Sequence, residues 1–535
     1  MQKHFNIAGP IDPADHYHID PIHRLDWDEV RHLIATKKYF VLHAPRQTGK
    51  TSTLLAMMKV LNEEGLYKAL YVNIEAAQAL RNNVDRAMGL ICQAIAASAR
   101  VYGVEPELEA LTDRLFADGR FPEGALTQQL SQWAQMSKQP IVLMLDEADA
   151  LVGDTLISLL RQIRAGYAQR PQAFPQSIVL CGVRDIRDYR IHTTHQEIIT
   201  GGSAFNIKAK SLVMGNFQKN EVQALYQQHT AETGQIFEQA IFPELWEDTK
   251  GQPWLVNALG DEMTWEDRSA RDRTTPITLE RYQAARERLI RSRQTHLDQL
   301  TDKLREPRVN RVMEAILGGE NTIANIHDDD LQYVEDLGLI TTRPSIAISN
   351  RIYQEIIPRE VTWAWQATIA NQETAWYVKP DGRLDIPLLL RAFQQFFREN
   401  SDVWLQGLPF REAGPQLILQ AFLQRIVNGG GRVNREYALG RKYTDLLLEW
   451  PLEPEGKGFY GEVQRVVFEL KILRHNLEKT IADGVQQVAD YARRQGSDEA
   501  YLIIFNRDPA VSWNRKIWER DGERAGDLHV SVWGS

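Results

Sequence analysis

The sequence has little cysteine and no long apolar run. Two cysteines, Cys92 and Cys181, occur among its 535 residues, too few for a cysteine metal cluster or a disulfide framework. Both lie in apolar runs, which favours small core residues. No stretch approaches the roughly 20 apolar residues of a membrane span, and the first residues lack the apolar region of a signal peptide. We therefore expect a cytoplasmic protein with no membrane partner.

An excess of positive charge is also missing. The chain carries 62 Lys and Arg against 71 Asp and Glu, a net charge of −9. The molecule as a whole is therefore not a polyanion binder, and any nucleic-acid surface must be local. A globular hydrophobic content of 43% in a chain too long for one core predicts about three domains.

Residues 39–52 have the order strand, loop, helix. The apolar run from Tyr39 to Leu42 predicts a buried strand, which ends before Pro45. A polar turn leads to Gly49-Lys50-Thr51, and an apolar, helix-prone stretch from Leu54 to Leu61 follows. This is the context that a P-loop requires, so the segment predicts a phosphate-binding loop.

The chemistry of a P-loop assigns roles within this segment. Backbone N–H groups cradle phosphate oxygens, Lys50 reaches the β- and γ-phosphates, and the Thr51 hydroxyl is placed to hold Mg²⁺. Ala44 stands where the motif has glycine; we expect it to be tolerated, because Gly49 is present. ATP and Mg²⁺ are the expected cofactors, and the expected binding residues are Ala44, Pro45, Arg46, Gln47, Thr48, Gly49, Lys50, Thr51 and Ser52.

A second nucleotide signature follows downstream. The apolar run from Ile141 to Leu145 ends in Asp146-Glu147, and a parallel strand would deliver both carboxylates to the sheet edge where ligands bind. Asp146 would support Mg²⁺ through water, and Glu147 would polarise the attacking water.

Four segments together carry a family resemblance: Ala-Pro-Arg-Gln-Thr-Gly-Lys-Thr, Leu-Asp-Glu-Ala-Asp, Gly-Val-Arg-Asp and Gly-Gln-Pro-Trp-Leu-Val. Over about residues 1–300 the chain resembles an AAA-like P-loop ATPase of the signal-transduction (STAND) and origin-recognition type. The resemblance implies an α/β fold of the additional-strand, catalytic-glutamate (ASCE) class, with a parallel sheet of strand order 5-1-4-3-2 and a helical lid. It implies that Pro253 in the lid meets the nucleotide and that Arg184, after the strand 177–182, senses the γ-phosphate. An ion pair of Arg184 with Asp185 or Asp188 is the alternative.

Two features follow the lid. The stretch 281–311 is locally basic, with Arg286, Arg288, Arg291 and Arg293 close together; such a run is either a solvated helix face or a surface for nucleic acid or nucleotide sensing. Residues 308–360 resemble a winged helix, which would bind DNA or only pack against the ATPase.

A third group of chemical residues lies near the end of the chain. Thr444-Asp445 and Phe468-Glu469-Leu470-Lys471 stand at the ends of predicted strands. Alternation puts Glu469 and Lys471 on one face, and Asp445 on the neighbouring strand can join them. Both carboxylates can hold Mg²⁺, and Lys471 can orient water or stabilise developing charge. The alternative is a solvated strand end with a salt bridge.

This group resembles the PD-(D/E)XK nuclease superfamily, with residues 400–510 as an α-β-β-β-α-β core. Glu412 fits the family's additional carboxylate, and Glu436 is its rival. Gln487 with Tyr491 resembles the Gln-x-x-x-Tyr found beside that site. The proline of the family name is replaced by Thr444.

These features predict four domains: an ATPase core over 1–212, a helical lid over 213–300, a winged helix over 301–362 and a nuclease-like domain over 363–535. The expected function is an ATP-driven switch that controls a Mg²⁺-dependent nuclease acting on DNA. The alternatives are a nucleotide-dependent DNA- or protein-binding scaffold with an inactive nuclease fold, and an ATPase acting on a protein partner. A homo-oligomer and a regulatory protein partner remain open.

Overall fold

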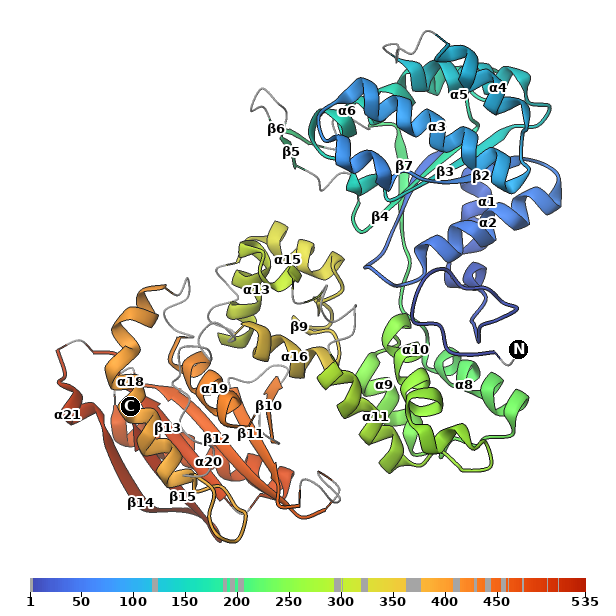
Figure 1. The fold of residues 1–535 in the computed structure, drawn as a ribbon. Helices are drawn as coiled ribbons and strands as arrows, with labels where there is room; N and C mark the ends of the chain where they lie inside the picture. The colour runs from blue at the N-terminus through green and yellow to red at the C-terminus, as the bar shows by residue number, and fades with distance from the viewer. Residues whose placement is uncertain are drawn as a thin grey trace. The chain divides into compact units, whose positions relative to one another are not determined.

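The computed structural model divides the chain into two compact units, each described by itself (Figure 1). The first comprises Met1–Leu289 with Asp336–Gly338, and the second Ile290–Glu335 with Leu339–Ser535. No helix in the described part of the chain is long and apolar enough to cross a membrane. The structure describes residues 3–117, 124–185, 190–192, 198–200, 206–292, 300, 302–318, 326–361, 377–407, 414–427, 431–437, 444–453, 459, 461–473, 476–497, 499–508 and 510–535.

A five-stranded parallel sheet forms the centre of the first unit. Its strands follow the spatial order β2-β3-β4-β1-β7, and every neighbouring pair is parallel. With β7 as the fifth strand of the ATPase core, this is the order 5-1-4-3-2, so the prediction is confirmed. The strands are β1 (Tyr39–His43), β2 (Lys68–Asn73), β3 (Ile141–Asp146), β4 (Ser177–Gly182) and β7 (Lys208–Val213).

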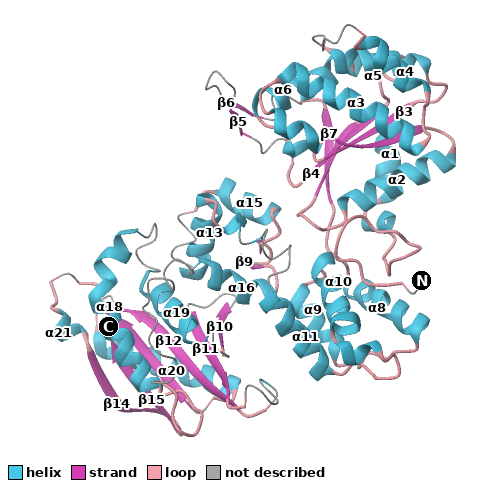
Figure 2. Cartoon of the chain, in the orientation of Figure 1, coloured by secondary structure: helices cyan, strands magenta, loops and turns pink. Residues whose placement is uncertain are grey.

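Helices cover both faces of this sheet. Successive side chains of each strand point to opposite faces, and the apolar side chains on both faces are buried. Phe40 and Leu42 pack with α1 (Trp27–Ala35) and α2 (Lys50–Glu64). Tyr39 and Val41 contribute to the opposite core. The helices of that core are α3 (Val84–Tyr102), α4 (Glu107–Leu115), α5 (Ala125–Met136) and α6 (Gly153–Ala165) (Figures 1 and 2). A small hairpin, β5 (Arg190–His192) and β6 (Ile198–Thr200), follows β4.

Four further helices complete the first unit: α8 (Lys219–Thr233), α9 (Ile241–Thr249), α10 (Pro253–Asp261) and α11 (Leu279–Ser292, up to Leu289 in this unit). Asn216 precedes α8 but is not its N-cap. Gln218 caps the helix in a reciprocal capping box with Glu221, which satisfies two backbone donors at once. Asn216 instead donates its side-chain amide to the carbonyl of Lys250.

The N-terminal segment packs on these helices. The Phe5 ring lies 4.9 Å from the Tyr226 ring, the Tyr17 hydroxyl donates to Glu232 over 2.6 Å, and Trp254 Nε1 donates to the carbonyl of Ile7 over 2.9 Å. His16 has a structural role in this segment, because its Nδ1 accepts a hydrogen bond from the backbone N–H of Asp12. Among the described residues no group of three acidic, His or Cys side chains is placed to hold a metal.

The second unit begins with short helices and a hairpin. These elements are α13 (Pro307–Gly318), α15 (Asp328–Asp336, up to Glu335 in this unit), β8 (Ile340–Thr341), β9 (Ala347–Ile348) and α16 (Arg351–Val361). Residues 308–360, which resemble a winged helix in sequence, thus contain helices and one short hairpin. The last helix continues through Pro358 to Val361.

A six-stranded mixed sheet forms the rest of the second unit, with spatial order β10-β11-β12-β13-β15-β14. One face packs on α18 (Ile386–Gly407) and α19 (Gly414–Val427); the other packs on α20 (Leu477–Gln495). A one-turn helix, α21 (Trp513–Lys516), precedes β14. The strands are β10 (Arg432–Tyr437), β11 (Thr444–Pro451), β12 (Val463–Ile472), β13 (Glu499–Phe505), β14 (Trp518–Ala525) and β15 (Leu528–Gly534).

Candidate nucleotide site and carboxylate site

The loop between β1 and α2 closes on itself around Lys50. Gly49 adopts φ +90°, a conformation that glycine accepts at little cost. A Cβ at this position would also lie 3.0 Å from Arg24 Nη1. Lys50 Nζ donates to the carbonyl oxygens of Ala44 and Pro45, each over 3.0 Å. The ammonium therefore lies over the loop, where a phosphate would replace these carbonyls as its partner.

Alanine at position 44 fits the loop. Ala44 is buried, donates its N–H to the carbonyl of Gly182 over 3.2 Å, and is not among the positive-φ residues. No conformation special to glycine is needed here, which explains the tolerance that the sequence predicts.

The other loop residues differ in their surroundings. Gln47 takes φ +56°, and its Oε1 is buried without a hydrogen-bond partner. Arg46 is exposed. Thr48 donates to the carbonyl of Pro45 over 2.7 Å, and the Ser52 hydroxyl accepts the backbone N–H of Ile11 over 3.0 Å. The second half of the loop is thus held by side chains, while Arg46 faces solvent.

The end of β3 brings Asp146 to the start of α2. Asp146 is fully buried, and its Oδ2 accepts the Thr51 hydroxyl over 2.7 Å and the Tyr71 hydroxyl over 3.1 Å. Its Oδ1 accepts the backbone N–H of Glu147 over 3.0 Å. The hydroxyl and the carboxylate that the sequence assigns to Mg²⁺ are therefore in direct contact. Oxygen ligands of these two types suit Mg²⁺.

Glu147 follows in a strained conformation. Its φ of +58° lies in the left-handed region that non-glycine residues rarely adopt outside turns and functional sites. Burial raises the pKa of its carboxyl group, and Lys50 partly opposes that rise. The charge of Lys50 therefore acts on this carboxyl group.

Arg184 and Pro253 occupy defined positions. Arg184, just beyond β4, is buried, and its Nε lies 3.2 Å from Oδ2 of Asp336, in the same unit. Asp185 pairs with Lys208 over 2.5 Å, and Asp188 lies outside the described residues, so Asp336 is the ion-pair partner that the structure gives for Arg184. Pro253 is the first residue of α10, where a missing N–H costs nothing.

Sequence reasoning missed Arg24. Its guanidinium donates to the carbonyls of Thr48 and Gly215 and lies 4.9 Å from the centre of the Phe217 ring. Burial lowers its pKa to about 10. One side chain thus joins the phosphate loop to the connection between β7 and α8. A lone arginine between Pro21 and a helix gives no sequence signal for this role.

The carboxylate site lies on the α20 face of the second sheet. Antiparallel pairing sets Glu436 opposite Asp445 and Asp445 opposite Glu469, so three acidic residues form one row across β10, β11 and β12. Directly opposed residues project to the same face. The Asp445 and Glu436 side chains themselves are outside the description, as is Glu412 entirely.

Glu469 and Lys471 are joined at this row. The Glu469 side chain is 0% exposed, and Lys471 Nζ lies 2.5 Å from its Oε1. Burial raises the pKa of Glu469 to about 7 despite the opposing effect of Lys471. No other described group donates a hydrogen bond to this carboxylate. Lys471 is thus the one described ion-pair partner of this buried carboxylate.

Helix α20 closes over the same row. Gly484 allows it to approach the sheet, because a Cβ there would lie 2.6 Å from the Leu502 side chain, and Leu502 pairs with Glu469 in register. One turn later, Gln487 Oε1 is buried and has no hydrogen-bond partner among the described residues, and Tyr491 is buried. Gln487 is therefore a candidate member of the site.

Comparison with known proteins identifies the nucleotide half. The signature of the AAA-like domain family matches residues 26–357, more than half of the chain. The chain belongs to the AAA-like domain family. It is therefore a nucleotide-binding AAA-like P-loop ATPase, as its P-loop geometry indicates. A search of curated proteins finds no match.

Three solved structures illustrate what this AAA-like protein is similar to. The Walker-type ATPase paby2304 of Pyrococcus abyssi is 13% identical (TM-score 0.44; 66% of this chain, 99% of that chain). Cdc6p of Pyrobaculum aerophilum is 13% identical (TM-score 0.33; 63% and 91%). The RuvB Holliday junction branch migration motor of Thermotoga maritima is 13% identical (TM-score 0.33; 61% and 92%). At these identities no function is transferred.

The basic stretch of this AAA-like ATPase is largely neutralised where it is described. Arg286 Nε lies 3.1 Å from Asp248, and Arg288 Nε lies 3.1 Å from Glu262. The side chains of Arg291 and Arg293 are outside the description. These ion pairs, with carboxylates that are themselves buried, favour a structural role in packing for Arg286 and Arg288 over a solvated helix face.

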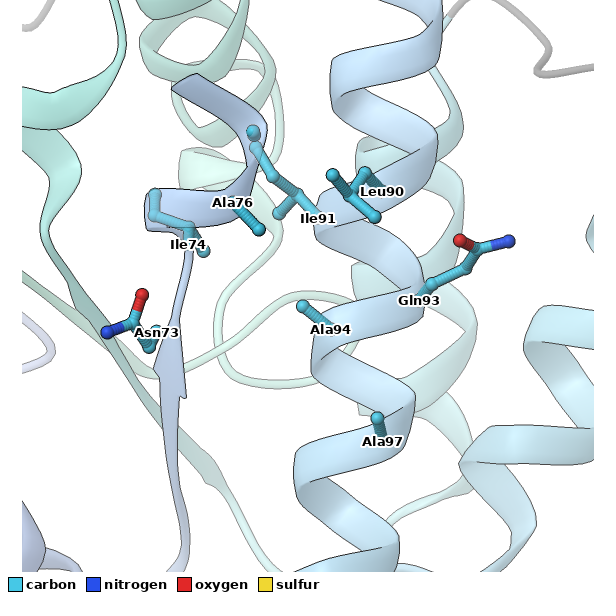
Figure 3. Close-up of a pocket in the computed structure, with 9 residues that line it drawn as sticks. Asn73, Ile74, Ala76, Leu90, Ile91, Gln93, Ala94 and Ala97 are labelled. Atoms are coloured by element: carbon cyan, nitrogen blue, oxygen red, sulfur yellow. The ribbon is translucent and has the colours of Figure 1, made fainter. Parts of the chain in front are cut away.

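A hollow of about 240 Å³ lies between α3 and the 3-10 turn Glu75–Leu80 after β2 (Figure 3). Its lining is almost wholly apolar, with Ile74, Leu90 and Ala94 among the residues labelled in the figure. None of the predicted nucleotide residues lines it, so it is separate from the phosphate loop.

Lys50 gives the first testable prediction. Replacing it with alanine removes the ammonium that lies over the loop, and ATP affinity should fall about 10- to 100-fold, the value of one or two charged hydrogen bonds. Calorimetric titration with ATP measures this. Lys59→Ala is the control, because Lys59 lies on the same helix with its side chain 75% exposed. Unchanged affinity in Lys50→Ala would remove the phosphate-site assignment.

Proposed function

We propose that this protein is an ATP-driven switch that controls a metal-dependent nuclease acting on DNA. The observation that carries the nuclease half is the strand register that pairs Asp445 with Glu469, next to the Lys471–Glu469 ion pair. The order of the surrounding elements, α19, β10, β11, β12, α20 and β13, supports it, because this is the α-β-β-β-α-β order of the nuclease resemblance.

The residues of the row would divide the nuclease chemistry. Asp445 and Glu469 would hold Mg²⁺, which supplies a water of lowered pKa when bound. The fit rests on the buried, singly partnered Glu469 carboxylate and on the unpartnered Gln487 Oε1. Lys471 would orient the water or balance charge that develops on the phosphate. Gln487 would help to position that water.

The ATPase half would use the first unit. Lys50 and the loop N–H groups would bind the β- and γ-phosphates, and Thr51 with Asp146 would hold Mg²⁺. Glu147 would accept a proton from the attacking water or orient it. Arg184 would contact the γ-phosphate, and Pro253 would contact the nucleotide from the helical lid.

A nicking assay tests the whole proposal. Supercoiled plasmid is incubated with the purified protein and Mg²⁺ or Mn²⁺, without nucleotide and with ATP, ADP or a non-hydrolysable ATP analogue. We expect metal-dependent conversion to the open circle whose rate depends on the nucleotide. Cleavage that ignores the nucleotide would remove the switch and keep the nuclease.

One observation favours the second candidate, a nucleotide-dependent DNA- or protein-binding scaffold with an inactive nuclease fold. The Glu469 side chain is wholly buried, and its raised pKa favours the neutral acid over a metal ligand. The scaffold predicts nucleotide-dependent binding to DNA or to a protein partner without cleavage, which gel-shift and plasmid assays on one preparation distinguish.

The raised pKa of Glu469 predicts a pH dependence of metal binding. Its carboxyl group is protonated below about pH 7, and a metal must displace that proton. Apparent Mn²⁺ affinity should therefore fall about fivefold from pH 7 to pH 6 and change little above pH 8. Electron paramagnetic resonance titration without nucleotide measures it. The Mn²⁺ binding that is present in the wild type and lost in Asp445→Asn belongs to this site. If that binding did not change with pH, the assignment would be contradicted.

A further inference from the structure

A tyrosine that no sequence motif marks contacts the Mg²⁺ carboxylate of the nucleotide site. Tyr71 lies on β2, next to β3 in the sheet, and pairs in register with Met144. Asp146 is two residues further along β3, so it projects to the same face as Met144. The Tyr71 hydroxyl is thereby brought to 3.1 Å from Oδ2 of Asp146.

We propose that Tyr71 is a positioning residue of the ATPase, which orients Asp146 for the nucleotide-bound Mg²⁺. This inference rests on the proposed ATP site. Asp146 Oδ2 has two side-chain donors, the hydroxyls of Thr51 and Tyr71, while its Oδ1 accepts the Glu147 backbone N–H. The three donors come from three elements and fix the carboxylate plane.

The surroundings of Tyr71 favour a specific role for its hydroxyl. Tyr71 is buried, and its backbone N–H faces Met58 Sδ at 3.4 Å. Its ring packs edge-on to the Tyr102 ring at 6.2 Å between centroids, so the ring has its own packing partners. The hydroxyl hydrogen bond is therefore the part of the side chain that reaches the site. Residues that orient metal ligands in this way typically change metal affinity 10- to 100-fold.

Tyr71→Phe removes only that hydroxyl. ATP affinity is measured by calorimetry with Mg²⁺ and with EDTA, and the ratio of the two dissociation constants gives the gain due to the metal. We expect an unchanged dissociation constant in EDTA and a gain reduced at least tenfold. A purely structural role would lower the melting temperature without changing this ratio.

Tyr102→Phe is the matched control, because Tyr102 is the ring neighbour and no hydrogen bond of its hydroxyl occurs among the described residues. Its gain should equal that of the wild type, and Asp146→Asn should abolish the gain. If Mg²⁺ strengthens ATP binding equally in the wild type and in Tyr71→Phe, the role of Tyr71 is overturned and the ATP site stands. A wild type without any Mg²⁺ gain would overturn both.

Discussion

Glu147→Gln should leave ATP bound and slow its hydrolysis by about 10²- to 10⁴-fold, the usual contribution of a general base. The amide keeps the shape of the side chain and loses the charge that accepts a proton from water. The strained backbone at Glu147 and the coupling of its carboxyl to Lys50 support this role. Such strain persists at functional sites because the surrounding structure holds it.

Phosphate release at saturating ATP and calorimetric ATP affinity separate the two effects. Glu75→Gln is the control, because Glu75 is an exposed carboxylate whose charge reaches Glu147. It should keep wild-type hydrolysis within a few-fold. Wild-type turnover in Glu147→Gln would move the role to another group, with Asp149 the next candidate.

The nucleotide half was predictable because its signals are local. An apolar run before Pro45, the Gly49-Lys50-Thr51 turn and a helix-prone stretch specify strand, loop and helix within one short segment. The sheet order and the chain's membership in the AAA-like family confirm that part of the prediction. The roles of individual residues remain predictions.

What the sequence could not predict depends on contacts between distant segments. Tyr71 reaches Asp146 only because β2 and β3 pair in one register, and Arg24 meets Thr48 and Gly215 only after folding. Strand β14 was missed because its Glu-Arg-Asp-Gly-Glu-Arg segment is polar throughout. At a sheet edge, charged residues protect the strand against further pairing, so the apolar alternation used to predict strands is absent.

The carboxylate site lies between these cases. Alternation on β12 predicts that Glu469 and Lys471 share a face, and the ion pair between them fits that prediction. The pairing of Asp445 with Glu469 needs the register of β11 against β12, which no short segment specifies. The depth at which Glu469 is buried, and hence its raised pKa, follows from the packing of α20 and β13.

Lys471→Ala should keep the fold, ATP hydrolysis and metal binding, and should slow DNA cleavage by on the order of 10²–10³, the effect of losing one charge-stabilising group. Both carboxylates remain, but nothing then orients the water or balances the developing charge. Because Lys471 holds down the pKa of Glu469, its loss raises that pKa further, so cleavage and Mn²⁺ binding are compared over a pH range that extends above pH 8. Asp445→Asn should lose metal binding and cleavage together.

Plasmid nicking, Mn²⁺ titration and phosphate release on the same preparations distinguish these outcomes. Lys479→Ala on α20 is the control, because Lys479 is exposed, and it should cut like the wild type. If Lys471→Ala cleaves DNA as fast as the wild type, the Lys471–Glu469 ion pair has a structural role and no role in cleavage. If the wild type cuts neither DNA nor RNA in any nucleotide state with Mg²⁺ or Mn²⁺, the nuclease proposal fails and the scaffold remains. The strand register, which sets Asp445 directly opposite Glu469, favours cleavage by the wild type and its loss in Lys471→Ala.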